Sequence, residues 1–155
     1  MDETIKRRLA TEWKKLAAGS VFSVQDFSVA LSKRQFLSFL SAYLDQGEVS
    51  QVVPNIYYKV KFSNLFNPPK ALPPDLSKVL AALTRLTGES FQYDGGYCAN
   101  RLGLSTQIPL YHVLHTSGRS RRFKLAGVDV VLNHMDVKLI KAIKDQLSLE
   151  EYAKL

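Results

Sequence analysis

The hydrophobic positions near the start of the chain repeat with the period of an α-helix. Four of them recur every three or four residues and predict a first helix with one apolar side: Ile5, Leu9, Trp13 and Leu16. Gly19 is a suitable C-terminal cap for this helix. A serine followed three residues later by an acid or an amide predicts two further helix starts. These are Ser23, for a short second helix, and Ser32, for a third helix that runs to about Gln46.

The segment after the third helix has the composition of a β-hairpin. Residues 48–61 are rich in Val, Ile and Tyr, with Pro54-Asn55 in the middle, which predicts two strands joined by a tight turn. Three helices followed by a hairpin describe a winged helix-turn-helix. We therefore expect residues 1–66 to form such a domain.

The second half of the sequence alternates between helical and strand-like segments. Asp75 caps a helix that extends to Thr87 and has one apolar side. Strands are predicted at 91–93, 110–115, 120–125 and 128–132, the last two around an Ala126-Gly127 turn. Further helical segments are predicted at 97–102, at 139–147 and, as a separate short helix, from Ser148 onward. The fold class is thus α+β: a winged helix-turn-helix followed by a small α+β module.

A proline-rich stretch divides the two halves. Four of the six prolines lie in residues 67–74, where each blocks helix continuation and removes a backbone donor. We interpret this stretch as a stiff linker between a domain of residues 1–66 and a domain of residues 75–155. Basic charge is not confined to either side of it, since nine Lys/Arg face six Asp/Glu before the linker and 12 face eight from residue 67 onward.

Composition narrows the class of protein. The 155 residues are 46% hydrophobic and 23% charged, which is ordinary for a folded domain and unlike a disordered chain. No apolar run approaches the ~20 residues of a membrane span, and the N-terminus has no apolar signal core. The single cysteine, Cys98, has no internal disulfide partner, which points to the cytoplasm. The net charge of +7 favours an anionic partner, nucleic acid first.

The third predicted helix has the side-chain pattern of a DNA-reading helix. At about 100° per residue, Phe36, Phe39 and Leu40 fall on one side and small or polar residues on the other. Small residues allow a helix to approach the major groove closely, and Arg, Gln and Ser reach base edges. We expect base contacts from Arg34, Gln35, Ser38 and Ser41. The expected phosphate contacts are Lys33, Lys59, Lys61, Arg7 and Lys14, with Arg8 and Lys15 beside the last two.

Two plainer interpretations stay open for this helix. Its polar side is also typical of a solvated helix surface, where Gln35 only completes the N-terminal cap. Three helices and a hairpin also serve as protein-interaction modules.

The densest basic cluster lies in the second half: Arg119, Arg121, Arg122 and Lys124. On a strand, Arg122 and Lys124 share one face while Arg121 and Phe123 share the other. This hairpin is either a surface for nucleic acid or an acidic protein partner, or a solvated hairpin.

No constellation in the sequence requires an enzyme. His112 and His115 are three residues apart on a predicted strand and point to opposite faces, so they do not chelate one metal together, and His134 adds no motif. Cys98 lies in no catalytic signature, and Gly95-Gly96 lacks the residues of a phosphate loop. We expect no catalytic residues, no metal and no cofactor.

Two segments of the second half resemble a known family. Residues 96–109 read Gly-Tyr-Cys-Ala-Asn-Arg-Leu-Gly-Leu-Ser-Thr-Gln-Ile-Pro, and residues 116–121 read Thr-Ser-Gly-Arg-Ser-Arg. Together they resemble the signature of AbiEi-like proteins, the antitoxins of bacterial type IV toxin–antitoxin systems. Residues 19–27, Gly-Ser-Val-Phe-Ser-Val-Gln-Asp-Phe, resemble the opening of the same family. The resemblance covers most of residues 4–135.

The resemblance implies a function that patterning alone does not. In this family, a winged helix-turn-helix binds inverted repeats in the promoter of its own operon and represses it. Cooperating monomers and a homodimer both suit an inverted repeat, and the sequence leaves the choice open. The C-terminal part counteracts a nucleotidyltransferase-like toxin without a stable toxin complex. The wing departs from the family pattern, because it lacks the usual arginine and carries Asn55 where relatives have glycine. The alternative function is a protein-interaction module that binds an acidic partner, or the toxin itself, through the basic hairpin.

Overall fold

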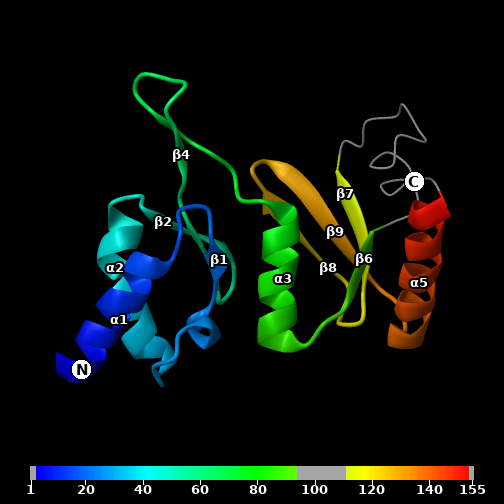
Figure 1. Cartoon of the computed structure of the whole chain (residues 1–155), viewed down its shortest axis with the longest axis horizontal. Helices are drawn as coiled ribbons and strands as arrows, with labels where there is room; N and C mark the ends of the chain where they lie inside the picture. The colour runs from blue at the N-terminus through cyan, green and yellow to red at the C-terminus, as the bar shows by residue number, and fades with distance from the viewer. Residues whose placement is uncertain (1–2, 94–110, 154–155) are drawn as a thin grey trace. The chain divides into compact units, whose positions relative to one another are not determined.

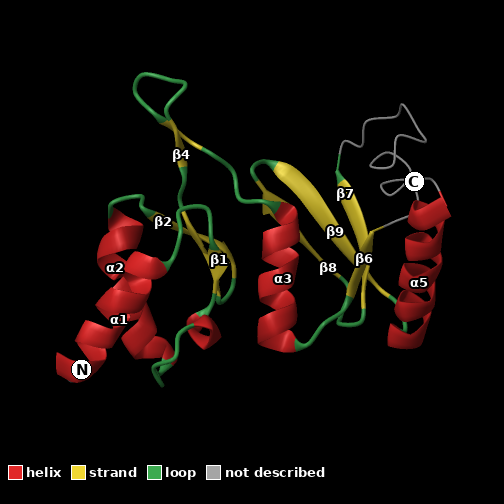
Figure 2. Ribbon diagram, in the orientation of Figure 1, coloured by secondary structure: helices red, strands yellow, loops and turns green. Residues whose placement is uncertain are grey.

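The computed structural model describes residues 3–93 and 111–153 as a mixture of helices and antiparallel or mixed sheets (Figures 1 and 2). The α+β fold class predicted from the sequence is confirmed. The chain divides into two compact units, Met1–Thr87 and Gly88–Leu155. Each unit has a sheet of its own.

The first unit begins with helices and a three-stranded sheet. In chain order its elements are α1 (Glu3–Lys15), β1 (Val21–Phe22), the 3-10 helix η1 (Val24–Asp26), α2 (Lys33–Asp45), β2 (Val49–Val53) and β3 (Ile56–Lys59). The sheet is antiparallel, in the order β1-β3-β2. The first and third predicted helices and the hairpin are confirmed. The second predicted helix is only a single 3-10 turn, and β1 was not predicted.

Local side-chain bonds explain where these elements start and turn. The Ser32 hydroxyl accepts from the Gln35 N–H at 3.1 Å, and the Gln35 amide oxygen accepts from the Ser32 N–H at 3.1 Å. This is the predicted capping box of α2. Asp26 accepts from the Ser23 N–H at 2.9 Å in the same manner. At the β2–β3 turn Asn55 has φ of 70°, a conformation that asparagine tolerates better than most residues.

An aromatic core joins the helices to the sheet. Phe22 on β1 lies 5.6 Å from Trp13 of α1, 6.2 Å from Phe36 of α2 and 6.0 Å from Tyr57 of β3, measured between ring centroids. Most of these rings meet edge to face, a favoured geometry for aromatic pairs. Leu9 and Leu40 are fully buried beside them. The inner sides of α1 and α2 are therefore fixed by one cluster.

The region predicted as a linker is structured. β4 (Phe62–Ser63) pairs antiparallel with β5 (Lys70–Ala71) to form a two-stranded arm, and α3 (Leu76–Thr87) follows. Residues 75–87 were predicted to belong to the second domain, whereas the structure groups α3 with the first unit. The physical reason is that α3 packs on β1 and β3 with Val79 and Ala82 fully buried. The boundary falls after Thr87 instead of at the prolines.

The second unit is a four-stranded sheet with a helix. It contains β6 (Phe91–Tyr93), β7 (His112–Thr116), β8 (Arg121–Leu125), β9 (Val128–His134) and α5 (Val137–Ala153). The strand order is β6-β7-β9-β8, with β7 and β9 parallel and the other pairs antiparallel. The predicted β8–β9 hairpin is confirmed, and its turn residues Ala126 and Gly127 both have positive φ. α5 packs on β6 and β7 and buries Ile140.

Two helical predictions for this unit have different outcomes. The sequence predicted two helices from residue 139 onward, but α5 is one continuous helix of 17 residues. Ser148 is therefore an interior helix residue instead of a cap. The helical segment predicted at 97–102 lies outside the described residues, as does Cys98.

We expect Arg85→Ala to destabilise the first unit. The Arg85 guanidinium of α3 donates to both carboxylate oxygens of Asp26, at 2.7 and 3.2 Å, and to the Val21 carbonyl at 3.2 Å. Because the pair is partly exposed, a loss of roughly 1 kcal/mol is expected from the free energy of unfolding. Urea denaturation would measure it, with the exposed Lys78→Ala of the same helix as the control. Equal midpoints for both variants would contradict this role of Arg85.

Candidate nucleic-acid interface

The outer side of α2 is polar and open. Arg34, Ser38 and Ser41 are exposed, while Phe36 and Leu40 are buried against the aromatic core. The Ser41 hydroxyl donates to the Ser38 carbonyl at 2.9 Å, so its oxygen remains available as an acceptor. The structure thus brings three of the predicted base-contacting residues onto one exposed side.

Leu37 belongs to this outer side and was missed by the sequence analysis. Its side chain is 37% exposed. The signal was present, because three helical steps of about 100° place it only about 60° from Arg34. In the major groove an apolar side chain at such a position contacts the methyl group of thymine.

The N-terminal turn of α2 carries two exposed cations, Lys33 and Arg34. Gln35 beside them is half-buried, and its carbonyl oxygen is occupied by the capping bond to Ser32. Its amide N–H groups are the part that remains for an external acceptor. The plainer interpretation of Gln35, that it completes the cap, is therefore confirmed, and any base contact is limited to donation.

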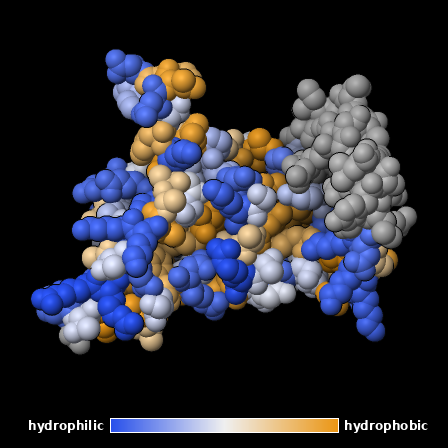
Figure 3. All heavy atoms as spheres, in the orientation of Figure 1, coloured by the Kyte–Doolittle hydropathy of each residue, from blue (hydrophilic) through white to orange (hydrophobic). Residues whose placement is uncertain are grey.

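α1 contributes basic residues away from its buried side. Arg7, Arg8, Lys14 and Lys15 are all exposed. Figure 3 shows hydrophilic side chains gathered over the part of the first unit formed by α1 and α2. A shallow groove of about 220 Å³ is lined by Arg7, Arg8, Thr11, Glu12 and Ser28.

Glu12 anchors the loop that precedes α2. Its carboxylate accepts from the Ser28 N–H at 3.0 Å. Hydrogen bonding by the Ser28 side chain, together with this backbone bond, lowers the pKa of Glu12 below its ordinary value, assisted by the charge of Arg8. Glu12 stays ionised between the basic residues and shapes the groove beside Arg7 and Arg8.

Lys59 has a different role from the one predicted. Its ammonium donates to the Trp13 carbonyl at 2.9 Å and to the Leu16 carbonyl at 2.8 Å, and it lies 4.4 Å from the centre of the Trp13 ring. These carbonyls are at the C-terminal end of α1, where a cation is stabilising. Burial lowers the pKa of Lys59. We therefore remove Lys59 from the predicted phosphate contacts, and the exposed Lys61 remains.

Arg121 of the second unit is also an internal residue. Its guanidinium forms a two-point ion pair with Glu89, with N–O distances of 2.9 and 2.8 Å, and the side chains are only 25% and 13% exposed. Arg122 and Lys124, by contrast, are exposed on the other face of β8, as the strand alternation predicted. The basic hairpin therefore presents Arg119, Arg122 and Lys124 outward, without Arg121.

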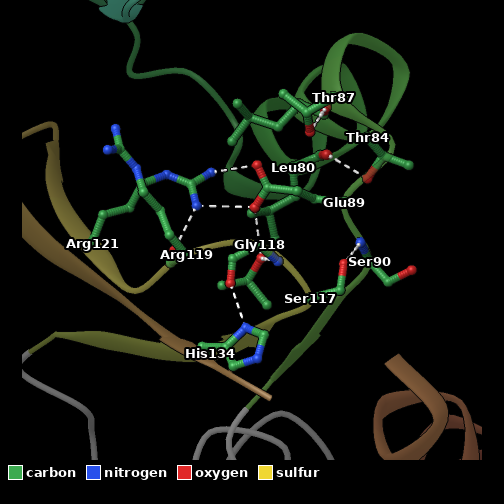
Figure 4. Close-up of polar contacts among 12 residues, drawn as sticks. Leu80, Thr84, Thr87, Glu89, Ser90, Ser117, Gly118, Arg119, Arg121 and His134 are labelled. Atoms are coloured by element: carbon green, nitrogen blue, oxygen red, sulfur yellow. Dashed lines mark hydrogen bonds and ion pairs between the residues drawn. The ribbon is translucent and has the colours of Figure 1, made fainter. Parts of the chain in front are cut away.

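The Glu89 carboxylate explains the Thr-x-Gly-x-x-Arg pattern of residues 116–121 (Figure 4). The Thr116 hydroxyl donates to it at 2.6 Å and accepts from the Gly118 N–H at 3.0 Å. A side chain at Gly118 would overlap the Glu89 carboxylate and displace it from this position. The Arg121 guanidinium donates to both oxygens of the same carboxylate. The pattern builds a turn around a partly buried carboxylate, and this turn fixes where β8 begins.

No group of three or more His, Cys, Asp or Glu is placed to hold a metal ion among residues 3–93 and 111–153. His112 and His115 lie on opposite faces of β7, and the His134 ring bonds to the Gly118 carbonyl at 2.7 Å. Burial lowers the pKa of His112.

A protein-family model matches residues 8–150, which span nearly all of both units. The chain belongs to the DUF6088 family. The description of DUF6088 is a family of unknown function. Neither the curated proteins nor the solved structures contain a match to this DUF6088 chain. Of the helices in its described part, none is long and apolar enough to cross a membrane.

We expect Lys59→Met to destabilise the DUF6088 chain and Lys61→Met to leave its stability unchanged. Loss of the Lys59 ammonium leaves the Trp13 and Leu16 carbonyls without this donor, at an expected cost of roughly 1–2 kcal/mol. Thermal unfolding followed by circular dichroism would measure the difference. Equal melting temperatures for Lys59→Met and the wild type would contradict the role of Lys59 at the end of α1.

We expect the neighbouring residues Arg121 and Arg122 to differ in the same way. Arg121→Ala leaves a partly buried Glu89 without its ion-pair partner, at an expected cost of about 2–4 kcal/mol of unfolding free energy. Arg122→Ala removes an exposed cation, and its cost is expected within about 0.5 kcal/mol. Chemical denaturation of both variants tests this. A larger loss for Arg122→Ala than for Arg121→Ala would refute the assignment.

Proposed function

We propose that this DUF6088 chain binds double-stranded DNA through its first unit, as a winged helix-turn-helix with α2 as the recognition helix. The element order α1, β1, η1, α2, β2, β3 and the sheet order β1-β3-β2 support the proposal, because they match that architecture with η1 in place of the second helix. The β2–β3 hairpin is then the wing.

The placement of α2 is the observation that carries this proposal. Its inner side is fixed on the aromatic core, and its outer side offers Arg34, Leu37, Ser38 and Ser41. A helix of 13 residues is about 20 Å long and fits a major groove about 12 Å wide. Lys33, Lys61, Arg7 and Lys14 are exposed for phosphate contacts.

We further propose that the protein is a cytoplasmic antitoxin of a bacterial type IV toxin–antitoxin system. The support is the resemblance of residues 96–109 and 116–121 to AbiEi-like proteins. On this proposal the chain represses its own operon at inverted repeats, as cooperating monomers or a homodimer, and counteracts a nucleotidyltransferase-like toxin. It acts by binding instead of by catalysis. Residues 96–109 lie outside the described residues.

One observation favours a second candidate function. Arg122 and Lys124 project from the same exposed face of β8, with Arg119 exposed before the strand. A surface of this charge fits an acidic protein partner, including the toxin itself. A stable complex with a nucleotidyltransferase-like protein encoded beside this chain, lost in Arg119→Ala/Arg122→Ala/Lys124→Ala, would favour this candidate.

We expect Arg34→Ala to weaken binding to the DNA upstream of the chain's own gene by about 1–3 kcal/mol, because a good base contact is lost. Fluorescence anisotropy would measure the dissociation constant. Lys138→Ala, which removes an exposed cation from α5 in the second unit, is the control. Affinity of the wild type should also fall steeply with salt. Absence of any wild-type binding at low salt would sink the DNA-binding proposal, and an unchanged Arg34→Ala would remove this residue from the interface.

A further inference from the structure

The arm formed by β4 and β5, residues 62–71, leaves large apolar side chains in solvent. Leu65 is 91% exposed, Phe66 49% and Phe62 47%. The arm extends beyond the sheet of the first unit (Figure 1), and Figure 3 shows a hydrophobic patch on one side of its tip, beside hydrophilic side chains. Leaving such side chains exposed costs free energy that burial against a partner would recover.

The base of the arm is anchored, so its direction is set by the first unit. The Leu72 N–H donates to the Lys61 carbonyl at 2.7 Å, and the Tyr58 hydroxyl of β3 donates to the Leu72 carbonyl at 2.8 Å. Tyr58 itself is buried. The arm therefore continues the wing strand β3, and its tip is held out on two short paired strands.

The charge of the arm selects the chemistry of its partner. Residues 49–74 contain no Asp or Glu, while Lys61 and Lys70 are exposed at the base of the arm. The Lys70 ammonium lies 4.7 Å from the centre of the Phe66 ring, so a cation and an apolar ring share one surface. Asn64 and Asn67 flank the two apolar tip residues. This surface complements a polyanion that also offers flat apolar faces.

Duplex DNA has both properties. Proteins that bind its minor groove use Lys and Asn at the groove edges and insert Leu, Phe or Pro between base steps, which unstacks the bases and bends the duplex. If the arm bound a second copy of the chain instead, the absence of Asp and Glu from residues 49–74 would not be needed. The arm carries two exposed apolar residues at its tip, and the Lys70 ammonium lies against the ring of one of them, so a cation can reach the phosphates beside the inserted side chains.

We propose that the arm is a second DNA contact, whose Leu65 and Phe66 insert into the minor groove next to the site read by α2 and bend the duplex. This inference rests on the proposed DNA-binding function. It adds to that function a contact outside the helix and the wing.

The test compares the full-length wild type with Leu65→Ser/Phe66→Ser. The matched control is Val137→Ser/Leu139→Ser, which removes two apolar residues of α5 that are 41% and 51% exposed. The probe is the duplex directly upstream of the chain's own gene, labelled at both ends for energy transfer and carrying 2-aminopurine at successive positions. Energy transfer reports bending, 2-aminopurine fluorescence reports unstacking, and anisotropy reports affinity. Sedimentation without DNA reports self-association.

We expect the arm variant to bind roughly tenfold more weakly, about 1.4 kcal/mol, and to lose both the bend and the 2-aminopurine signal. The control variant should behave as the wild type. Wild-type bending and unstacking in the arm variant would overturn the inference while leaving the proposed function intact. An arm variant that changes from dimer to monomer but still bends its DNA would overturn it in favour of a self-association arm. Absence of wild-type binding would end both proposals.

Discussion

The first unit depends on the packing of one aromatic residue, Phe22. Its ring contacts one aromatic side chain from α1, one from the segment after η1, one from α2 and one from β3: Trp13, Phe27, Phe36 and Tyr57. Such a ring fixes the mutual position of elements that local sequence cannot fix. The outer side of α2 is defined only because its inner side is held there. The exposed outer surface of α2 is thus a consequence of the core.

Several basic residues are used inside the protein, which changes the meaning of its net charge of +7. Lys59 caps α1, Arg85 holds Asp26, and Arg121 holds Glu89. Each of these cations binds carbonyl oxygens or a carboxylate within its own unit. Fewer cations are open to a partner than the net charge suggests. The exposed ones lie on α1, at the start of α2, on the arm, on α3, on the outer face of β8 and on α5.

The sequence predicted the elements that have strong local signals and missed those that depend on distant partners. Periodicity found α1 and α2, the Ser32–Gln35 capping box marked the start of α2, and Ala126-Gly127 marked the β8–β9 turn. β1 has only two residues and exists through its pairing with β3, so no local pattern revealed it. β5 was not predicted, because the prolines of residues 67–74 are typical of a linker as well as of an arm. Lys59 and Arg121 were misassigned, since no pattern shows which cation meets a buried acceptor.

The strand β3 connects these observations, because consecutive residues of it serve different parts of the first unit. Ile56 is buried beside the β2–β3 turn, and Tyr57 enters the aromatic core. The Tyr58 hydroxyl anchors the base of the arm, and the Lys59 ammonium caps α1. Because side chains alternate between faces along a strand, one four-residue segment reaches the core and the helix end as well as the arm. A shift of β3 by one residue would exchange these roles all at once, so the β2–β3 hairpin, the arm and the end of α1 are set by a single register.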